Sequence, residues 1–443
     1  MNVNLVNKQI KIQVLLSFGI KVLSLIINFL LVPLTISYVG VESYGIWLVL
    51  SSIIAWFSMF DMGLGHGLRN RLSQSIANSN LILSREYIST AYLIISLISV
   101  FIIILFLALN NYLDWNLILN TEILNSSKLS EIAILTVLFF CLQFVLRLIT
   151  IILTANSLPI VSSAVNLVSN IVILGMLYIA QDRLDHSLLQ LVIIYSAPSA
   201  ILLFVLSVLL FSFKYRAMRP SITHVKVRHM HKIMGLGSKF FFLQLEVLVI
   251  FQATNIIITQ LFGLTEVAIF NIVYKYFGTI QIIFAIIMNV YWSEITKAIE
   301  KDNLTWVKVI IRKMKIRWYY SIPIAITMLI FSDIFYKIWL SDNYIAIPFV
   351  LSLTVCVFVL VASLNSIYEY SLNGAGKLGI MMISAVISAV IYVPIAYVNV
   401  KIFGFGVEGV VLAMILVQLI NLLVLPMQLD RLLNKKTTGI WDR

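Results

Sequence analysis

Long apolar runs separated by short polar breaks cover this chain of 443 residues. Crossing the hydrocarbon core of a bilayer takes about 20 apolar residues, and twelve segments of the chain fit that length. Those of the first half are 12–36, 44–64, 87–109, 129–153, 158–180 and 188–212. Those of the second half are 239–262, 267–290, 318–340, 345–372, 378–400 and 405–429. The pattern predicts an all-α integral membrane protein with twelve transmembrane helices.

The longest polar break, Phe213–Lys232, lies almost at the midpoint and reads FKYRAMRPSITHVKVRHMHK. It carries many basic residues and separates six apolar runs from six others. We therefore predict an N-terminal six-helix bundle over 1–213, a basic cytoplasmic connector over 214–232 and a C-terminal six-helix bundle over 233–443.

A short internal match supports two equivalent halves. The chain reads YVGVESYGIW from Tyr38 and LFGLTEVAIF from Leu261, so Gly40 aligns with Gly263. Glycine is the residue that most easily adopts the backbone of a tight turn. Both copies are expected to return the chain at once into the next helix, on the outer side of the membrane. The halves are then parallel repeats about an axis along the membrane normal.

Composition fixes the class and the orientation of the protein. Hydrophobic residues make up 61% of the chain and charged residues only 11%, far from the values of a soluble domain. The net charge of +12 is spread over short breaks between apolar runs, which does not indicate a nucleic-acid binder. Most Lys and Arg fall in alternate breaks, and this bias predicts cytoplasmic termini.

Residues 297–317 differ from a plain loop. Leu304, Val307 and Ile311 recur at helical spacing, and Lys308 and Arg312 lie on another face. This segment predicts an amphipathic cytoplasmic helix that rests on anionic lipid headgroups.

No motif for catalysis, nucleotide binding or metal binding is present, so the chain is predicted not to be an enzyme and to use no cofactor. Transport driven by ATP hydrolysis within this chain is also excluded. The chemistry is therefore expected in polar side chains inside the spans.

Four charges lie deep in predicted spans: Lys21, Arg147, Glu246 and Lys275. Each charge facing lipid costs about 2.5–3.5 kcal/mol even on the lenient insertion scale, so they are expected to face a wet cavity or one another. One carboxylate neutralises one of three cations, and the surplus favours an anionic substrate. The alternative is structural: Glu246 pairs with Lys275, and the other two cations reach an interface or backbone carbonyls.

Amides share helix faces with these cations. Asn28 follows Lys21 at helical spacing, Gln143 lies four residues before Arg147, and Asn271 four before Lys275. The predicted substrate-binding residues are Lys21, Arg147, Lys275, Asn28, Gln143 and Asn271.

The motif DMGLGHGLRNRL begins at Asp61 at the inner end of the second span. Its glycines suit a flexible helix end, and Asp61 and Arg69 are predicted to form a gate or contact a headgroup. Topology-setting arginines at a flexible end are the alternative interpretation. Because no nucleotide site exists, proton or sodium coupling is the expected driving force, with Glu246, Asp333 and Glu369 as the titratable candidates.

The run YVGVESYGIWLVLSSIIAWFSMFDMGLGHGLRNRL, Tyr38–Leu72, resembles O-antigen flippases of the multidrug/oligosaccharidyl-lipid/polysaccharide exporter superfamily. The turn LNGAGKL, Leu372–Leu378, agrees with this resemblance. The resemblance implies two six-helix bundles that form a V around a central cavity. It implies flipping of an undecaprenyl-diphosphate-linked sugar unit by alternating access, from the cytoplasmic to the periplasmic leaflet of a bacterial inner membrane. It does not fix the cavity cations.

The protein is expected to be a monomer and to act in lipopolysaccharide biosynthesis. Its expected partners are a polysaccharide polymerase and a chain-length regulator. The alternatives are a cation-coupled multidrug exporter, a membrane polysaccharide polymerase or ligase, and a scaffold that transports nothing. An exporter of cationic drugs needs acidic groups where this chain has a basic surplus. A polymerase needs a large external loop, and every predicted outer loop is short.

Overall fold

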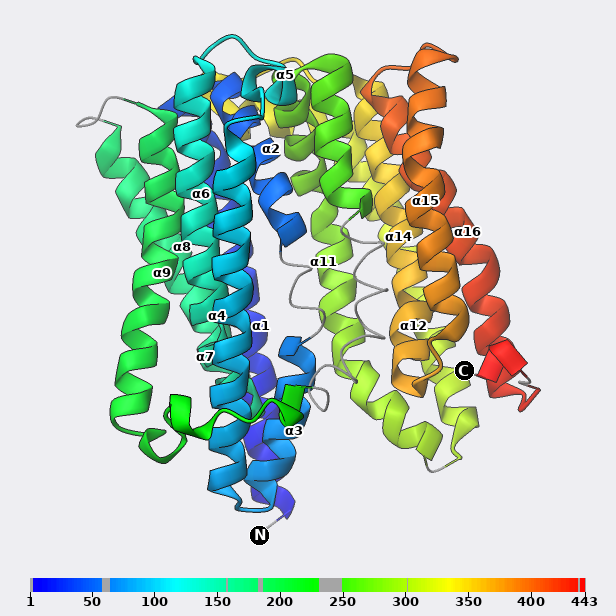
Figure 1. The fold of residues 1–443 in the computed structure, drawn as a ribbon. Helices are drawn as coiled ribbons and strands as arrows, with labels where there is room; N and C mark the ends of the chain where they lie inside the picture. The colour runs from blue at the N-terminus through cyan, green and yellow to red at the C-terminus, as the bar shows by residue number, and fades with distance from the viewer. Residues whose placement is uncertain are drawn as a thin grey trace. The chain divides into compact units, whose positions relative to one another are not determined.

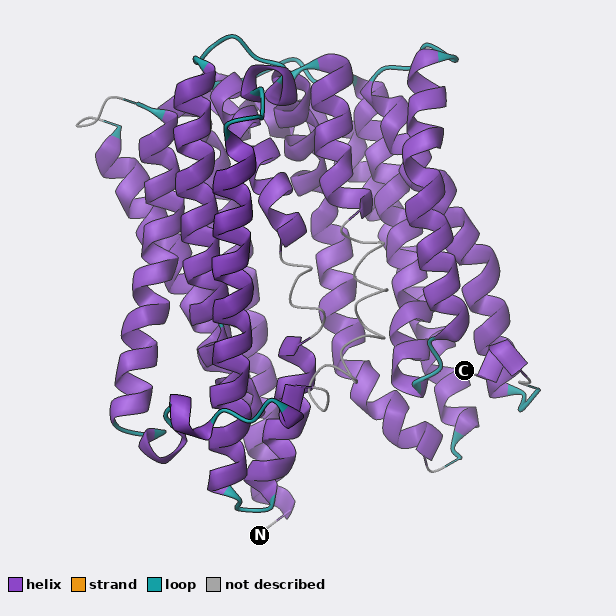
Figure 2. Ribbon diagram, viewed as in Figure 1, coloured by secondary structure: helices purple, strands orange, loops and turns teal. Residues whose placement is uncertain are grey.

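The computed structural model describes residues 3–57, 64–156, 158–181, 186–230, 249–300, 302–436 and 439–442, and these are helical with no strand among them (Figure 2). The helices of the first half are α1 Val3–Val39, α2 Val41–Phe57, α3 Leu64–Ala77, α4 Leu81–Asn110, α5 Trp115–Leu119, α6 Ser126–Leu146, α7 Leu148–Ala155, α8 Pro159–Ala180 and α9 Leu188–Ser212. Those of the second half are a helix over Val249–Phe262, α11 Leu264–Glu300, α12 Leu304–Ile330, α13 Ser332–Leu340, α14 Phe349–Ala375, α15 Gly379–Lys401 and α16 Val407–Leu433. The predicted all-α class is confirmed.

Among the described residues, nine helices are long and apolar enough to cross a membrane, or ten if α12 and α13 form one bent span. Two shorter apolar helices, Val41–Trp56 and Val249–Phe262, coincide with the predicted second and seventh spans. The chain is therefore a multi-pass membrane protein, as the hydrophobic pattern predicts.

The chain divides into two compact units, Met1–Phe241 and Phe242–Arg443. In the first unit, α1 packs on α8, α6 packs on α4 and α9, and α3 packs on α4 and α7 (Figure 1). In the second unit, α14 contacts α11, α12 and α16, and it is the most deeply buried of the described spans. The predicted start of the C-terminal bundle at residue 233 lies outside the described residues.

The two predicted glycine turns are present. Gly40 separates α1 from α2 with φ +80°, and Gly263 separates the helix Val249–Phe262 from α11 with φ +98°. Positive φ is costly for residues with a Cβ atom, so glycine is required by conformation at both places. The Gly40 N–H donates to Ile36 O at 2.8 Å, which closes the end of α1 before α2 begins.

The described part of the connector is bound to the first unit. Two short 3₁₀ turns, η2 Arg216–Met218 and η3 Ile222–His224, lie against α4. Arg85 Nε donates to Arg219 O at 2.9 Å, and the Ser221 N–H donates to Ser89 Oγ at 3.0 Å. His229 Nε2 lies 2.8 Å from Glu86 Oε2, and the imidazole is 2% exposed. The connector up to residue 230 is therefore a strap that crosses α4 near its start, visible in green in Figure 1.

The predicted amphipathic helix is not a separate element. Residues 304–317 form the first part of α12, which continues without a break to Ile330, after Asn303 caps it through the Trp306 N–H at 3.2 Å. The helix continues through Pro323, so the basic segment and the span join.

The predicted single span 318–340 is bent instead. Helices α12 and α13 meet at 62° around Phe331. The Ser332 hydroxyl donates to Leu329 O at 2.8 Å, which is the local side-chain bond that competes with continued helix.

Candidate functional site in the N-terminal unit

The predicted fourth span corresponds to Ser126–Ala155, one continuous apolar span with a one-residue turn at Arg147. We call this turn the break between α6 and α7. Helix α6 ends at Leu146, α7 begins at Leu148, and Arg147 forms the turn between them with φ −60° and ψ −18°. The Thr150 N–H donates to Arg147 O at 3.0 Å, an i to i+3 bond that tightens the chain locally. Such 3₁₀ turns inside a helix often mark functional positions.

Two threonines account for the break. Thr150 Oγ1 donates to Arg147 O at 2.7 Å, and Thr154 Oγ1 donates to Thr150 O at 2.7 Å. A hydroxyl that bonds back to a carbonyl of the preceding turn competes with the helical ladder and bends helices. No proline or glycine is needed to interrupt the span here.

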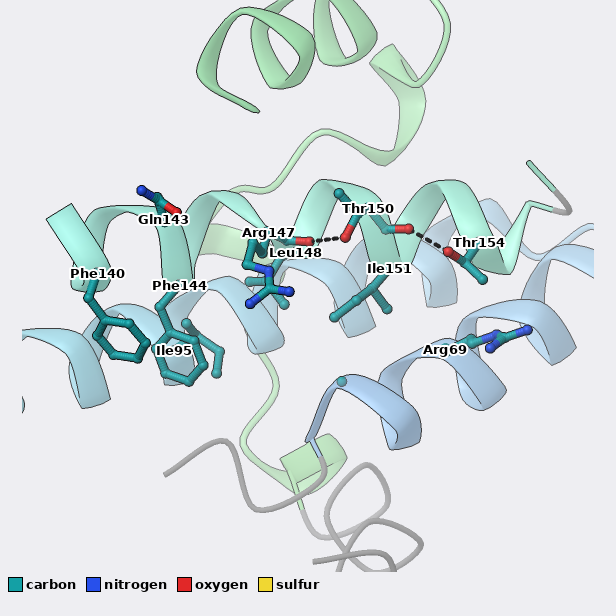
Figure 3. Close-up of a pocket in the computed structure, with 11 residues that line it drawn as sticks. Arg69, Ile95, Phe140, Gln143, Phe144, Arg147, Leu148, Thr150, Ile151 and Thr154 are labelled. Atoms are coloured by element: carbon teal, nitrogen blue, oxygen red, sulfur yellow. Dashed lines mark hydrogen bonds between the residues drawn. The ribbon is translucent and has the colours of Figure 1, made fainter. Parts of the chain in front are cut away.

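A cavity of about 330 Å³ lies beside this break, within the first unit (Figure 3). Helices α3, α4, α6 and α7 surround it. The residues that line it are Gly65, Arg69, Ile95, Phe140, Gln143, Phe144, Arg147, Leu148, Thr150, Ile151 and Thr154. We call this the α6–α7 pocket. It brings together three residues predicted from the sequence: Arg69, Gln143 and Arg147.

Both arginines of the α6–α7 pocket are exposed, Arg147 at the helix break and Arg69 on α3. None of the described residues that line the pocket is acidic, and within the described ranges no carboxylate forms an ion pair with either guanidinium. Each guanidinium offers five N–H donors in a planar fork that matches phosphate or carboxylate oxygens. The arrangement is suited to bind an anion within the membrane span.

Beside its polar residues, the pocket has an apolar and aromatic wall. Phe140 and Phe144 lie one turn apart on α6 with ring centroids 5.4 Å apart and an interplanar angle of 19°. In Figure 3 both rings lie on the same side of α6 as Arg147, next to Ile95 of α4. Ligand pockets typically combine such apolar walls with a few polar groups that fix orientation.

The three predicted amides already donate hydrogen bonds. Gln143 Nε2 donates to Ser196 O of α9 at 2.9 Å, and Asn28 Nδ2 donates to Ser24 O at 2.8 Å. Asn271 Nδ2 donates to Asn255 Oδ1 at 2.9 Å and to Val267 O at 2.8 Å. Gln143 and Asn271 therefore join helices, and their predicted role in substrate binding stays a prediction.

The other two predicted cations do not line the α6–α7 pocket. Lys21 is half-buried on α1, and Lys275 is half-buried on α11 of the second unit. Their predicted contact with substrate is likewise a prediction.

The predicted coupling and gate residues fall in different settings. Asp61 and Glu246 lie outside the described residues. Asp333 is 56% exposed, pairs with Lys337 at 2.7 Å and accepts a hydrogen bond from Tyr344 Oη at 2.6 Å. Glu369 is half-buried on α14.

Sequence reasoning missed the Phe140–Phe144 pair and the break itself. The spacing of four residues between the two phenylalanines was a usable signal, since i and i+4 side chains meet on one helix face. The sequence also shows Thr150 and Thr154, but only the structure shows that their hydroxyls donate to backbone carbonyls.

Comparisons with known proteins place this geometry in context. No family model matches the chain. A protein of Yersinia pseudotuberculosis named "Putative O-antigen export protein" is 25% identical over 415 residues, which cover 90% of this chain and 90% of that protein.

Solved structures share the fold. An inward-facing multidrug resistance MATE family transporter of the MOP superfamily aligns with a TM-score of 0.76 at 15% identity, over 96% of this chain and all of that one (100%). The lipid II flippase MurJ, in an inward closed conformation, aligns with a TM-score of 0.69 at 16% identity, over 97% of this chain and 89% of that one. The resemblance predicted from the sequence is confirmed: one curated relative carries an O-antigen name, and a flippase and an exporter share the fold.

Proposed function

We propose that this protein flips undecaprenyl-diphosphate-linked O-antigen or related oligosaccharide units from the cytoplasmic to the periplasmic leaflet of a bacterial inner membrane. The observation that carries the proposal is the α6–α7 pocket, which presents Arg147 and Arg69 within a membrane unit and has no acidic residue among its described lining residues. A diphosphate is the anionic part of such a substrate. The O-antigen name of the Yersinia relative supports the same class of cargo.

In this proposal Arg147 binds the diphosphate during passage. It lies eight residues before Ala155, the inner end of α7, which corresponds to about 12 Å along a helix axis. Burying an anion at that depth is costly unless charge-assisted hydrogen bonds replace its water. Arg69, on α3, adds a second positive charge to the same pocket.

The remaining predicted residues take supporting roles in the proposal. Lys21 and Lys275 add positive charge inside the spans of their own units, Asn28, Gln143 and Asn271 offer amide oxygens, and Asp61 acts with Arg69 as a gate. Lys21→Ala and Lys275→Ala are expected to impair export at normal protein level, whereas the corresponding arginine variants retain much of it because the charge is kept.

The driving force is proposed to be a proton or sodium gradient coupled through Glu246, with Asp333 and Glu369 as further candidates. Transport reconstituted in proteoliposomes is then expected to respond to at least one of the two gradients. Transport that ignores both would contradict the coupling.

We further propose that the protein works by alternating access and that both termini are cytoplasmic. It is proposed to act beside a polysaccharide polymerase and a chain-length regulator. A reporter enzyme active only in the periplasm is expected to be silent when fused after Arg219, Asn303 or Arg443 and active after Asn111. Activity after Arg219 would contradict the proposed orientation.

The experiment that tests the function is deletion of the gene in its own strain, followed by mass spectrometry of lipid-linked sugars. The proposal predicts accumulation of the undecaprenyl-diphosphate-linked unit and loss of surface polysaccharide, both reversed by the gene supplied in trans. An exporter of cationic drugs predicts drug sensitivity with an unchanged lipid-linked pool, and that result would contradict the proposal.

A further inference from the structure

The α6–α7 pocket has an aromatic end as well as a cationic one. Phe140 and Phe144 stack one helical turn apart on α6, and Arg147 follows three residues after Phe144, directly after the end of that helix. Figure 3 shows the two rings, then the guanidinium, in this order along one side of α6. A ligand in the pocket thus meets an apolar surface and a charge about one helical turn apart, about 5 Å.

The aromatic end is held in place from behind. Phe144 packs on the buried cluster of Leu64, Leu68, Tyr87 and Ile95, which joins α3 and α4. Both rings remain partly exposed although they line a pocket inside the unit. A ligand that packs a flat apolar surface on these rings buries further apolar area, which is favourable.

The chemistry of the occupant follows from the proposed function, on which this inference rests. In a lipid diphosphate that carries sugars, the group bonded directly to phosphate is a sugar ring, and such a ring has one face made largely of C–H groups. Stacking of that face on an aromatic ring buries apolar surface and leaves the hydroxyls at the edge free to bond.

We infer that Phe140 and Phe144 form a binding subsite for the sugar bonded directly to the diphosphate, while Arg147 binds the adjacent phosphate. The cavity of about 330 Å³ lies at the small end of ligand pockets, about 300–1,000 Å³. It therefore receives the first sugar and its phosphate, not the whole unit. The subsite selects loaded carrier lipid over the same lipid without sugar.

The test measures binding of three probes to the purified full chain in nanodiscs. The probes are undecaprenyl diphosphate alone, and the same lipid carrying either one glucose or one N-acetylglucosamine. The wild type is expected to bind at least one sugar-bearing probe about tenfold more tightly than the bare lipid, a gain in the range of aromatic contacts.

The test variant is Phe140→Leu with Phe144→Leu, which keeps apolar side chains against the core and removes the flat faces. Its preference for the sugar-bearing probe over the bare lipid is expected to fall to about twofold or less. The matched control is Phe101→Leu with Phe204→Leu on α4 and α9, two rings that are 55% and 56% exposed outside the pocket. This control is expected to keep the full preference.

The outcomes separate this inference from the proposed function. If the wild type binds bare and loaded lipid equally, or if the leucine variant keeps the preference, the aromatic subsite is overturned and the flippase proposal stands. If the wild type binds none of the three lipids, the proposed function fails and the subsite fails with it.

Discussion

Arg147 of the first unit and Lys275 of the second unit are both mid-span cations, but they lie in different local structures. In the first unit, Arg147 lies at the break between α6 and α7 and is exposed to a pocket. In the second unit, Lys275 is half-buried within α11, which runs unbroken for 37 residues. One turn before Lys275, the Asn271 amide donates both to Asn255 Oδ1 and to its own helix.

The difference separates a binding surface from a packing surface. At the break, the exposed Arg147 side chain lines a pocket, where it can meet a ligand. Along a continuous helix, polar side chains in a membrane are satisfied by neighbouring helices. Of these residues, Arg147 is the one expected to contact ligand, and Asn271 the one expected to hold helices together.

The largest effect is expected for Arg147→Ala. Losing one charge-assisted contact to phosphate costs about 1.5–3 kcal/mol, which is about ten- to a hundredfold in affinity, so export should fall steeply. Complementation of a flippase-null strain, with protein level checked by blot, measures this loss.

Two further variants make this result specific. Arg147→Lys should retain only part of the activity, because a lysine cannot form the bidentate fork. Lys128→Ala, an exposed cation at the start of the same helix α6, should complement fully. Full complementation by Arg147→Ala would contradict the account.

Asn271→Ala is expected to act on stability. The change removes a donor from Asn255 Oδ1, on a side chain 7% exposed, and leaving a buried acceptor short of a bond costs about 1–3 kcal/mol. The midpoint of thermal unfolding in detergent should fall. Lys275→Ala should instead lower export with little change in that midpoint. A lower midpoint for Lys275→Ala together with lower export for Asn271→Ala at an unchanged midpoint would contradict these assignments.

The connector strap offers a test away from both cations. His229→Phe keeps a ring beside Tyr87, whose centroid lies 4.7 Å from the imidazole, but removes the bond to Glu86. We expect a loss of about 1–3 kcal/mol in unfolding free energy, typical of a hydrogen bond to a charged group. Arg228→Ala, an exposed neighbour, is the control and should unfold like the wild type.

The smallest effect is expected for Thr150→Val. It removes the 2.7 Å bond from the hydroxyl to Arg147 O, which is worth about 0.5–1.5 kcal/mol, and it relaxes the break. Thr150→Ser keeps a hydroxyl and serves as the control. Export by Thr150→Val should drop about two- to tenfold, and unchanged export would show that the break does not depend on this bond.

The fold was largely predictable because each span shows in the apolar pattern and two turns demand glycine. Span 188–212 was predicted with the bounds that α9 has, and Gly40 and Gly263 have the positive φ that their turns require. Arg147 was predicted as a binding residue from depth alone, because an unpaired charge in a span is costly.

Two of the misses share one physical cause. The break at Arg147 and the bend at Phe331 depend on whether a hydroxyl bonds to a carbonyl one turn earlier. Sequence gives the hydroxyl but not its rotamer. The amphipathic segment was predicted as a separate surface helix because periodicity shows faces and not where a helix ends, and the helix of 304–317 simply continues into the span.

The central claim, that Arg147 binds the diphosphate of a lipid-linked substrate, is tested most directly by binding. The purified wild type, Arg147→Ala and Lys128→Ala are each titrated with undecaprenyl diphosphate and with undecaprenol, which lacks the phosphates. The account predicts that Arg147→Ala binds undecaprenyl diphosphate about ten- to a hundredfold more weakly, that Lys128→Ala matches the wild type, and that undecaprenol does not distinguish the three. Equal affinity of Arg147→Ala and the wild type for the diphosphate would contradict it.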